Sequence, residues 1–177
     1  TTGGTNPDQG EGTGDSLSNP DISAGLITIT DAVCGKNCQG HTITGTTPTN
    51  SISIRSGEHK ITLKNVNIDL SSQPPDTSAP AFDIRPGATV HLFLEGQNIL
   101  KSPSTYAGLC VPEGAVIDIN DSTNGELEVI GGDGGAGIGA QAVGPAGTIT
   151  INGGKITATG GIRSAGIGGA VGGGGGT

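Results

Sequence analysis

Large side chains are almost missing from this sequence. Its 177 residues include one Tyr and two Phe, and neither Trp nor Met. The core of a globular protein of this length normally contains bulkier residues. Here the apolar content is almost entirely Val, Ile, Leu and Ala, which predicts a thin, repetitive core of stacked aliphatic side chains.

Positive charge is also scarce. The chain has 8 Lys and Arg against 16 Asp and Glu, and a formal net charge of -8. The basic residues form no cluster, so binding to nucleic acid is not expected. No apolar run approaches about 18 residues, so insertion into a membrane is not expected either.

Glycine is abundant, with 35 residues, and its distribution divides the chain in two. The first part, residues 1–21, is polar and Gly-rich and has little apolar surface to bury, which predicts a disordered tail. From Ile22 to Thr177, apolar residues alternate with polar ones and glycines separate the runs. We therefore expect one folded domain over residues 22–177, with glycine at its turns.

The cysteines bear on the compartment. Because the chain starts at Thr1 and has no Met, we expect it to be a processed or excised piece of a longer protein. Cys34 and Cys38 lie four residues apart, in a short loop that a disulfide would close in an extracellular location; two free thiols are the alternative. Cys110 lies between Leu109 and Val111 and is expected to be a buried, inert thiol.

An internal repeat gives the main evidence for the fold. Residues 131–139 match residues 160–168 at an offset of 29, and the same offset relates residues 107–109 to 136–138 and 127–130 to 156–159. Upstream copies follow at offsets of 30 and 27, which relate residues 54–57 to 84–87 and 87–92 to 114–119. Such drift in period is typical of stacked coils with insertions in their turns.

Each repeat contains about three short stretches of strand-like sequence. These stretches are residues 107–111, 116–120 and 127–130 and their copies. In the second and third of them, aliphatic residues alternate with polar ones such as Thr, Asp and Glu, so one side of these strands faces a shared interior. The sequence therefore predicts an all-β fold, a right-handed parallel β-helix with about 27–30 residues per coil. A β-sandwich is the rival, but it would not produce a 29-residue repeat.

The repeat motifs carry a family resemblance. Residues 34–45, 111–115, 132–139 and 149–161 resemble the β-helical Gly-rich repeat regions of Gram-positive bacterial surface proteins, which are described as carbohydrate-binding domain-containing or adhesin-like. The resemblance covers residues 22–177 and implies an extracellular or cell-surface location. Its motifs are turn and core residues, so they specify architecture more than function.

The end of the repeat array raises two alternatives. No capping segment is visible before Thr177, and an uncapped coil presents free strand edges. Either the chain is a fragment of a longer array, or its open end stacks on another copy to give a head-to-tail filament.

Carboxylates are the only candidates for catalysis. A glycosidase needs two of them across the scissile bond, and the pairs available are Asp118 with Asp121 and Glu126 with Glu128. The first pair lies in a polar stretch that is typical of a turn, and the second points to one solvated side of a strand. We therefore expect no catalytic residues and no enzyme activity.

Metal and cofactor sites have little support. Asp118, Asn120 and Asp121 offer oxygen ligands that calcium accepts, but not at the spacing of a known calcium loop. His41, His59 and His91 are isolated and are expected on the surface. We predict no metal site and no cofactor.

These observations favour a non-catalytic extracellular module that is structural or adhesive. Self-association through open ends is one alternative for it, and a fragment of a longer array is the other. A glycan-binding module is the alternative, with a polysaccharide as partner and Tyr106 as the one plausible aromatic platform. A polysaccharide-degrading enzyme is the third option.

Overall fold

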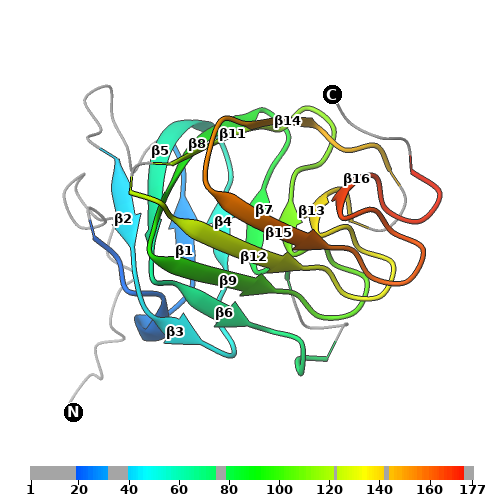
Figure 1. Cartoon of the computed structure of the whole chain (residues 1–177), viewed down its shortest axis with the longest axis horizontal. Helices are drawn as coiled ribbons and strands as arrows, with labels where there is room; N and C mark the ends of the chain where they lie inside the picture. Colours follow the sequence, from blue (N-terminus) through cyan, green and yellow to red (C-terminus); the bar gives the residue numbers. More distant parts are fainter. Residues whose placement is uncertain (1–18, 32–39, 75–78, 122, 142–143, 174–177) are drawn as a thin grey trace, which may run out of the picture.

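Short parallel strands account for almost all of the regular structure. The computed structural model describes residues 19–31, 40–74, 79–121, 123–141 and 144–173. In these residues the strands form three sheets, and successive strands visit the first, second and third sheet in turn. The chain therefore winds as a parallel β-helix, which confirms the predicted fold (Figure 1).

The strand bounds follow this order. The first sheet contains β1 (Ile27–Ile29), β4 (Ile52–Ile54), β7 (Phe82–Ile84), β10 (Leu109–Cys110), β13 (Ile138–Gly139) and β16 (Ile167–Gly168). The second contains β2 (His41–Ile43), β5 (Gly57–Lys64), β8 (Ala88–Glu95), β11 (Val116–Asp121) and β14 (Thr148–Ile151). The third contains β3 (Thr46–Thr47), β6 (Asn67–Asp69), β9 (Gln97–Lys101), β12 (Glu126–Ile130) and β15 (Lys155–Thr159). One turn of 3-10 helix, η1 (Ile22–Ala24), precedes β1. Among the described residues, no helix is long and apolar enough to cross a membrane.

The pairing register reproduces the sequence repeat. Leu109 pairs with Ile138 and Ile138 with Ile167, at the predicted offset of 29. Ile54 pairs with Ile84, and Val90 with Ile117, at the predicted offsets of 30 and 27. The similarity found in the sequence is therefore the hydrogen-bonding register of the three sheets.

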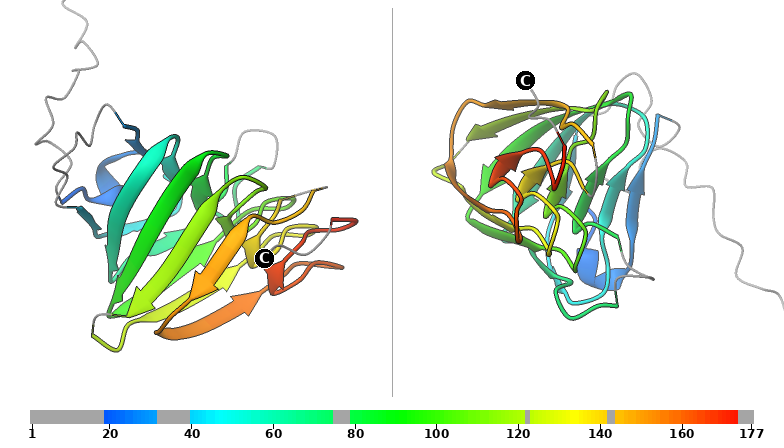
Figure 2. Two further views of the ribbon diagram at one scale, coloured as in Figure 1. Left: turned by 90° about the horizontal axis from the view of Figure 1, so that it is seen from above. Right: turned by 90° about the vertical axis from the view of Figure 1, so that its right-hand side faces the viewer.

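Stacked aliphatic side chains fill the interior. Ile61, Leu92, Ile119 and Ile151 are register partners in the second sheet, and the first three are completely buried. Burying one such side chain contributes about 1.5–3 kcal/mol, so each column stabilises the coils it joins. The right-hand view of Figure 2, taken from the side of the C-terminal coils, shows the three sheets as three walls around this interior.

The strands of the first sheet are shorter than predicted. The expected strands over residues 107–111 and 136–140 are reduced to the two-residue strands β10 and β13. Gly139 has a φ of 140°, and a β-carbon there would overlap the carbonyl oxygen of Gly168 in the next coil. The chain leaves regular strand geometry at this point because the two backbones approach so closely.

A buried amide joins three coils at the corner between the second and third sheets. Asn98 is 1% exposed, and its Oδ1 accepts a hydrogen bond from the Val66 amide at 2.9 Å. Its Nδ2 donates to the carbonyl oxygens of Glu95 and Glu126, each at 3.2 Å. One side chain thus provides hydrogen-bond partners for three backbone groups at this corner.

Replacing Asn98 should therefore destabilise the fold. We expect Asn98→Ala to lower the free energy of unfolding by about 2–3 kcal/mol, because it leaves buried backbone groups without partners. Urea denaturation followed by circular dichroism measures this change. The matched variant Gln97→Ala removes an exposed amide from the same strand, and its effect should stay within about 0.5 kcal/mol; equal effects of the two variants would contradict the role given to Asn98.

Candidate functional site

One end of the β-helix exposes the core. β14, β15 and β16 each lie at the end of a sheet, with no described strand on their outer side (Figure 2). Ile151 is 41% exposed and Ile167 47% exposed, whereas their partners Ile119 and Ile138 in the preceding coil are completely buried. We call this surface, formed by Ile149, Ile151, Ile156 and Ile167, the open end.

The opposite end differs in its burial. Ile22 of η1, Ile29 of β1 and Ile43 of β2 are completely buried. The segment before β1 closes part of this end: the Ile22 amide donates to the Thr44 carbonyl at 2.9 Å, and the Thr44 amide donates to the Pro20 carbonyl at 3.2 Å. The open end therefore exposes core isoleucines, whereas the exposed apolar residue near the opposite end is Leu26, directly before β1.

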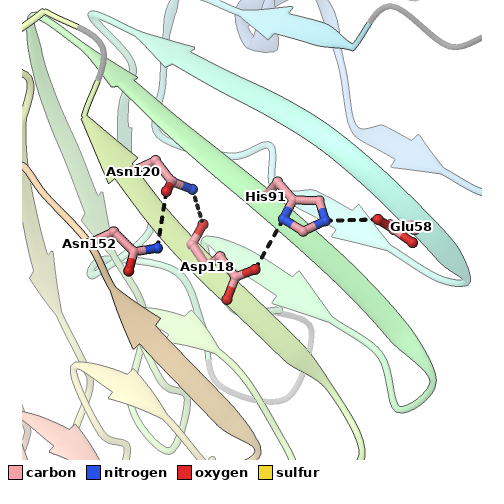
Figure 3. Close-up of polar contacts among 5 residues, drawn as sticks. All are labelled: Glu58, His91, Asp118, Asn120 and Asn152. Carbon is pink, nitrogen blue, oxygen red and sulfur yellow. Dashed lines mark hydrogen bonds and ion pairs between the residues drawn. The ribbon is translucent and has the colours of Figure 1, made fainter.

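A polar ladder crosses the outer face of the second sheet (Figure 3). His91 of β8 contacts Glu58 of β5 through Nε2 at 2.9 Å and Asp118 of β11 through Nδ1 at 3.1 Å. Carboxylate oxygens only accept hydrogen bonds, so the imidazolium form is the one that donates to both partners. The ladder links three successive coils by their outward side chains.

Amides continue the ladder towards the open end. The Nδ2 of Asn152 donates to the Oδ1 of Asn120 at 3.1 Å, and the Nδ2 of Asn120 donates to the Asp118 carbonyl at 3.1 Å (Figure 3). Beside Asn120 in register lies Phe93, which points outward and is half-buried, with the Lys60 ammonium 4.8 Å from its ring centre. Tyr106 is the one aromatic platform expected above, but the alternation along β8 also places Phe93 on the outer face.

The first carboxylate pair does not converge. Asp118 points outward from β11 and contacts His91. The Oδ1 of Asp121 instead accepts hydrogen bonds from the backbone amides of Thr123 at 3.0 Å and Gly125 at 2.9 Å. Asp121 therefore stabilises a turn, as the sequence predicted for this stretch, and Asp118 belongs to the ladder.

The second carboxylate pair lines a shallow groove of about 340 Å³ on the outer face of the third sheet. Glu126 and Glu128 lie on the same side of β12, as predicted, and Lys155 Nζ is 3.2 Å from Glu126 Oε1. The outward side chains of Gln97, Ile99 and Thr157 complete the groove, which combines amide, carboxylate, ammonium and hydroxyl groups with one aliphatic side chain. Such groups bind polar ligands by hydrogen bonds.

Two of the three histidines are buried, and the expectation of a surface position is wrong for them. His41 is 5% and His59 2% exposed, with ring centres 6.3 Å apart. The inward alternation of Ile61 and Leu63 extends back along β5 to His59, and the Nε2 of His59 bonds to the Ser56 carbonyl at 2.6 Å. This alternation is the sequence signal that would have placed it inside.

An ion pair between a buried carboxylate and an exposed guanidinium lies on the first sheet. Asp83 is 4% exposed, and its Oδ2 is 2.8 Å from the Nε of Arg85. Burial raises the pKa of the Asp83 carboxyl, and the Arg85 charge partly opposes that rise. Cys110, the register partner of Asp83, is 1% exposed, and burial together with the Asp83 charge raises its pKa far above the usual thiol value; the predicted buried position is confirmed. Cys34 and Cys38 lie outside the described residues.

No metal centre is assembled in the part of the chain that the structure describes, where no three His, Cys, Asp or Glu side chains come together as ligands.

No protein-family model, curated protein or solved structure matches this chain.

Two aspartates should affect the pH dependence of stability with opposite signs. The raised pKa of Asp83 means that the folded state holds its proton more tightly, so this group lowers stability as the pH rises through the Asp range. The Ser71 hydroxyl lowers the pKa of Asp69, so that group adds stability over the same rise.

The test compares the free energies of unfolding at about pH 3 and about pH 7, on either side of the ordinary Asp pKa. From the lower to the higher pH, the free energy of unfolding should rise more, or fall less, in Asp83→Asn than in the wild type. In Asp69→Asn it should rise less, or fall more. Shifts in the same direction would contradict these assignments.

Proposed function

We propose that this chain is a non-catalytic structural or adhesive module of an extracellular or cell-surface protein, and that it associates end to end through its open end. The observation that carries the proposal is the half-exposed isoleucine surface of β14, β15 and β16. The resemblance to Gram-positive surface repeats supports the extracellular location.

The shape of the open end favours one kind of partner. It presents three parallel strand edges around an apolar centre. Another coil of the same cross-section would pair the N–H and C=O groups of all three edges and bury the apolar centre at the same time. At the other end, β1 also has no described strand on its outer side. Head-to-tail stacking of a second copy keeps every strand parallel, as within the chain, and repeated stacking produces a filament.

The surface chemistry also supports a structural role. Along the ladder, His91 bonds to Asp118 and Asn152 bonds to Asn120 across successive coils. Asn120 also bonds to the Asp118 carbonyl within β11. Hydrogen bonds of this kind between outward side chains stiffen the wall of the β-helix. A catalytic pair, in contrast, needs carboxylates that face a common substrate, and Asp118 and Asp121 have separate partners.

A charge placed at the open end should weaken association. We expect Ile151→Lys to weaken self-association at least about tenfold, because it replaces an isoleucine that the second copy would bury. Light scattering and negative-stain microscopy of the full chain measure the size of the assemblies. The control Thr150→Lys adds the same charge to the same strand, but on its outer face, and should associate like the wild type.

Circular dichroism checks that both variants are folded. A wild-type chain that stays monomeric at all concentrations contradicts the proposal. So does equal weakening by Ile151→Lys and Thr150→Lys, because that result assigns the effect to charge alone.

Glycan binding is the second candidate function, and the polar groove of the third sheet is the observation that favours it. Its groups match the hydroxyls of a sugar chain. Phe93 is a less favourable platform, because the Lys60 ammonium already lies over its ring.

Affinity electrophoresis in gels that contain soluble polysaccharides tests this candidate. If the groove binds sugar, Glu128→Gln should weaken retardation about tenfold, because a carboxylate accepts stronger hydrogen bonds from hydroxyls than an amide does. Glu113→Gln makes the same change at an exposed turn away from the third sheet and should have no effect. Equal retardation of the wild type and both variants would remove the groove as a binding site.

A further inference from the structure

Two Asn-Gly pairs lie in exposed turns of the chain. Asn124 is followed by Gly125 after β11, and Asn152 by Gly153 after β14, and both asparagines are exposed. In such a pair, the glycine nitrogen can attack the side-chain carbonyl carbon of the asparagine. Glycine lacks a β-carbon, so the approach is not shielded.

The two glycine nitrogens have different surroundings. The Gly125 N–H donates to the Oδ1 of Asp121 at 2.9 Å. The Gly153 N–H has no hydrogen-bond acceptor among the described residues. Attack requires this nitrogen to lose its proton, and a neighbouring carboxylate disfavours a developing negative charge. The bond to Asp121 therefore holds Gly125 in its turn and opposes its reaction.

We propose that Asn152 is a site of spontaneous deamidation and that Asp121 protects Asn124 from the same reaction. A bond forms between the Gly153 nitrogen and the Asn152 Cγ, and the bond from Cγ to Nδ2 breaks. Ammonia leaves with the proton from the Gly153 nitrogen. Water then opens the resulting succinimide at either carbonyl to give aspartate or isoaspartate, with no change in oxidation state.

The reaction alters the end of the polar ladder. The amide of Asn152 donates to Asn120 (Figure 3), and a carboxylate at this position has no proton to donate. The 3.1 Å contact then joins two acceptors, so the last bond of the ladder is lost. A new negative charge also appears directly after β14, beside the open end.

Peptide mass spectrometry of the full chain, incubated at mildly alkaline pH, tests the proposal independently of any assembly. We expect Asn152 to convert at least about fivefold faster than Asn124. This ratio is the change in rate expected when one hydrogen bond adds to the activation barrier. In urea the two sites should convert at similar rates, because both are followed by glycine and the difference comes from the fold. Equal rates in the folded protein, or a difference that persists in urea, would overturn it.

The variant Asp121→Ala tests the protection directly. It should raise the rate at Asn124 at least about fivefold relative to the rate at Asn152. The ratio of the two rates is the measure, because Asp121 also lies against the backbone at Gly153. The control Asp118→Ala removes a carboxylate of the same strand that bonds to His91 instead, and should change neither rate. An unchanged rate at Asn124 in folded Asp121→Ala would show that Asp121 does not protect it.

Discussion

The register between successive coils is the constraint on which this structure depends. A single coil has too little apolar surface to be stable alone, and it becomes stable only when its aliphatic side chains lie on those of the next coil. Columns such as Ile61, Leu92 and Ile119 satisfy this requirement with fully buried members. Because side chains alternate across a strand, a slip of one residue would turn a whole column outward. Core packing and backbone hydrogen bonding therefore select the same alignment.

The same stacking organises the polar groups. Equivalent positions of successive coils lie next to each other, so outward residues meet partners about one repeat away in the sequence, as His91 meets Glu58 and Asp118. At the corners, Asn98 uses this proximity to bond to backbone groups of three coils. Charge and amide groups are largely engaged in maintaining the walls. This use of the surface is consistent with a structural module, and it leaves the open end and the groove of the third sheet as the places for partners.

The fold was predictable because one signal, alternation within a 29-residue repeat, determines both strand direction and register. The repeat alone aligns Leu109 with Ile138 and Ile167, and these residues pair as aligned. Alternation also indicates Phe93 outside and His59 inside, so the surface position expected for His59 was wrong although the pattern contained the right answer. The burial of Asp83 was not predictable, because it lies between Phe82 and Ile84 and the alternation assigns it to the outward side of β7. The separate roles of Asp118 and Asp121 likewise depend on where β11 ends.

The connection between β6 and β7, residues 70–81, is the longest path from the third sheet back to the first. The strands on both sides of it nevertheless stay in register, with Ile54 beside Ile84 and Phe82 beside Leu109. Extra chain is thus accommodated at a corner, where it changes neither the cross-section nor the spacing of the coils. In a β-helix of this kind, the corner is the position at which sequence can be gained or exchanged over evolution while the stacked coils keep their shape. The scaffold and whatever it displays can therefore diverge independently.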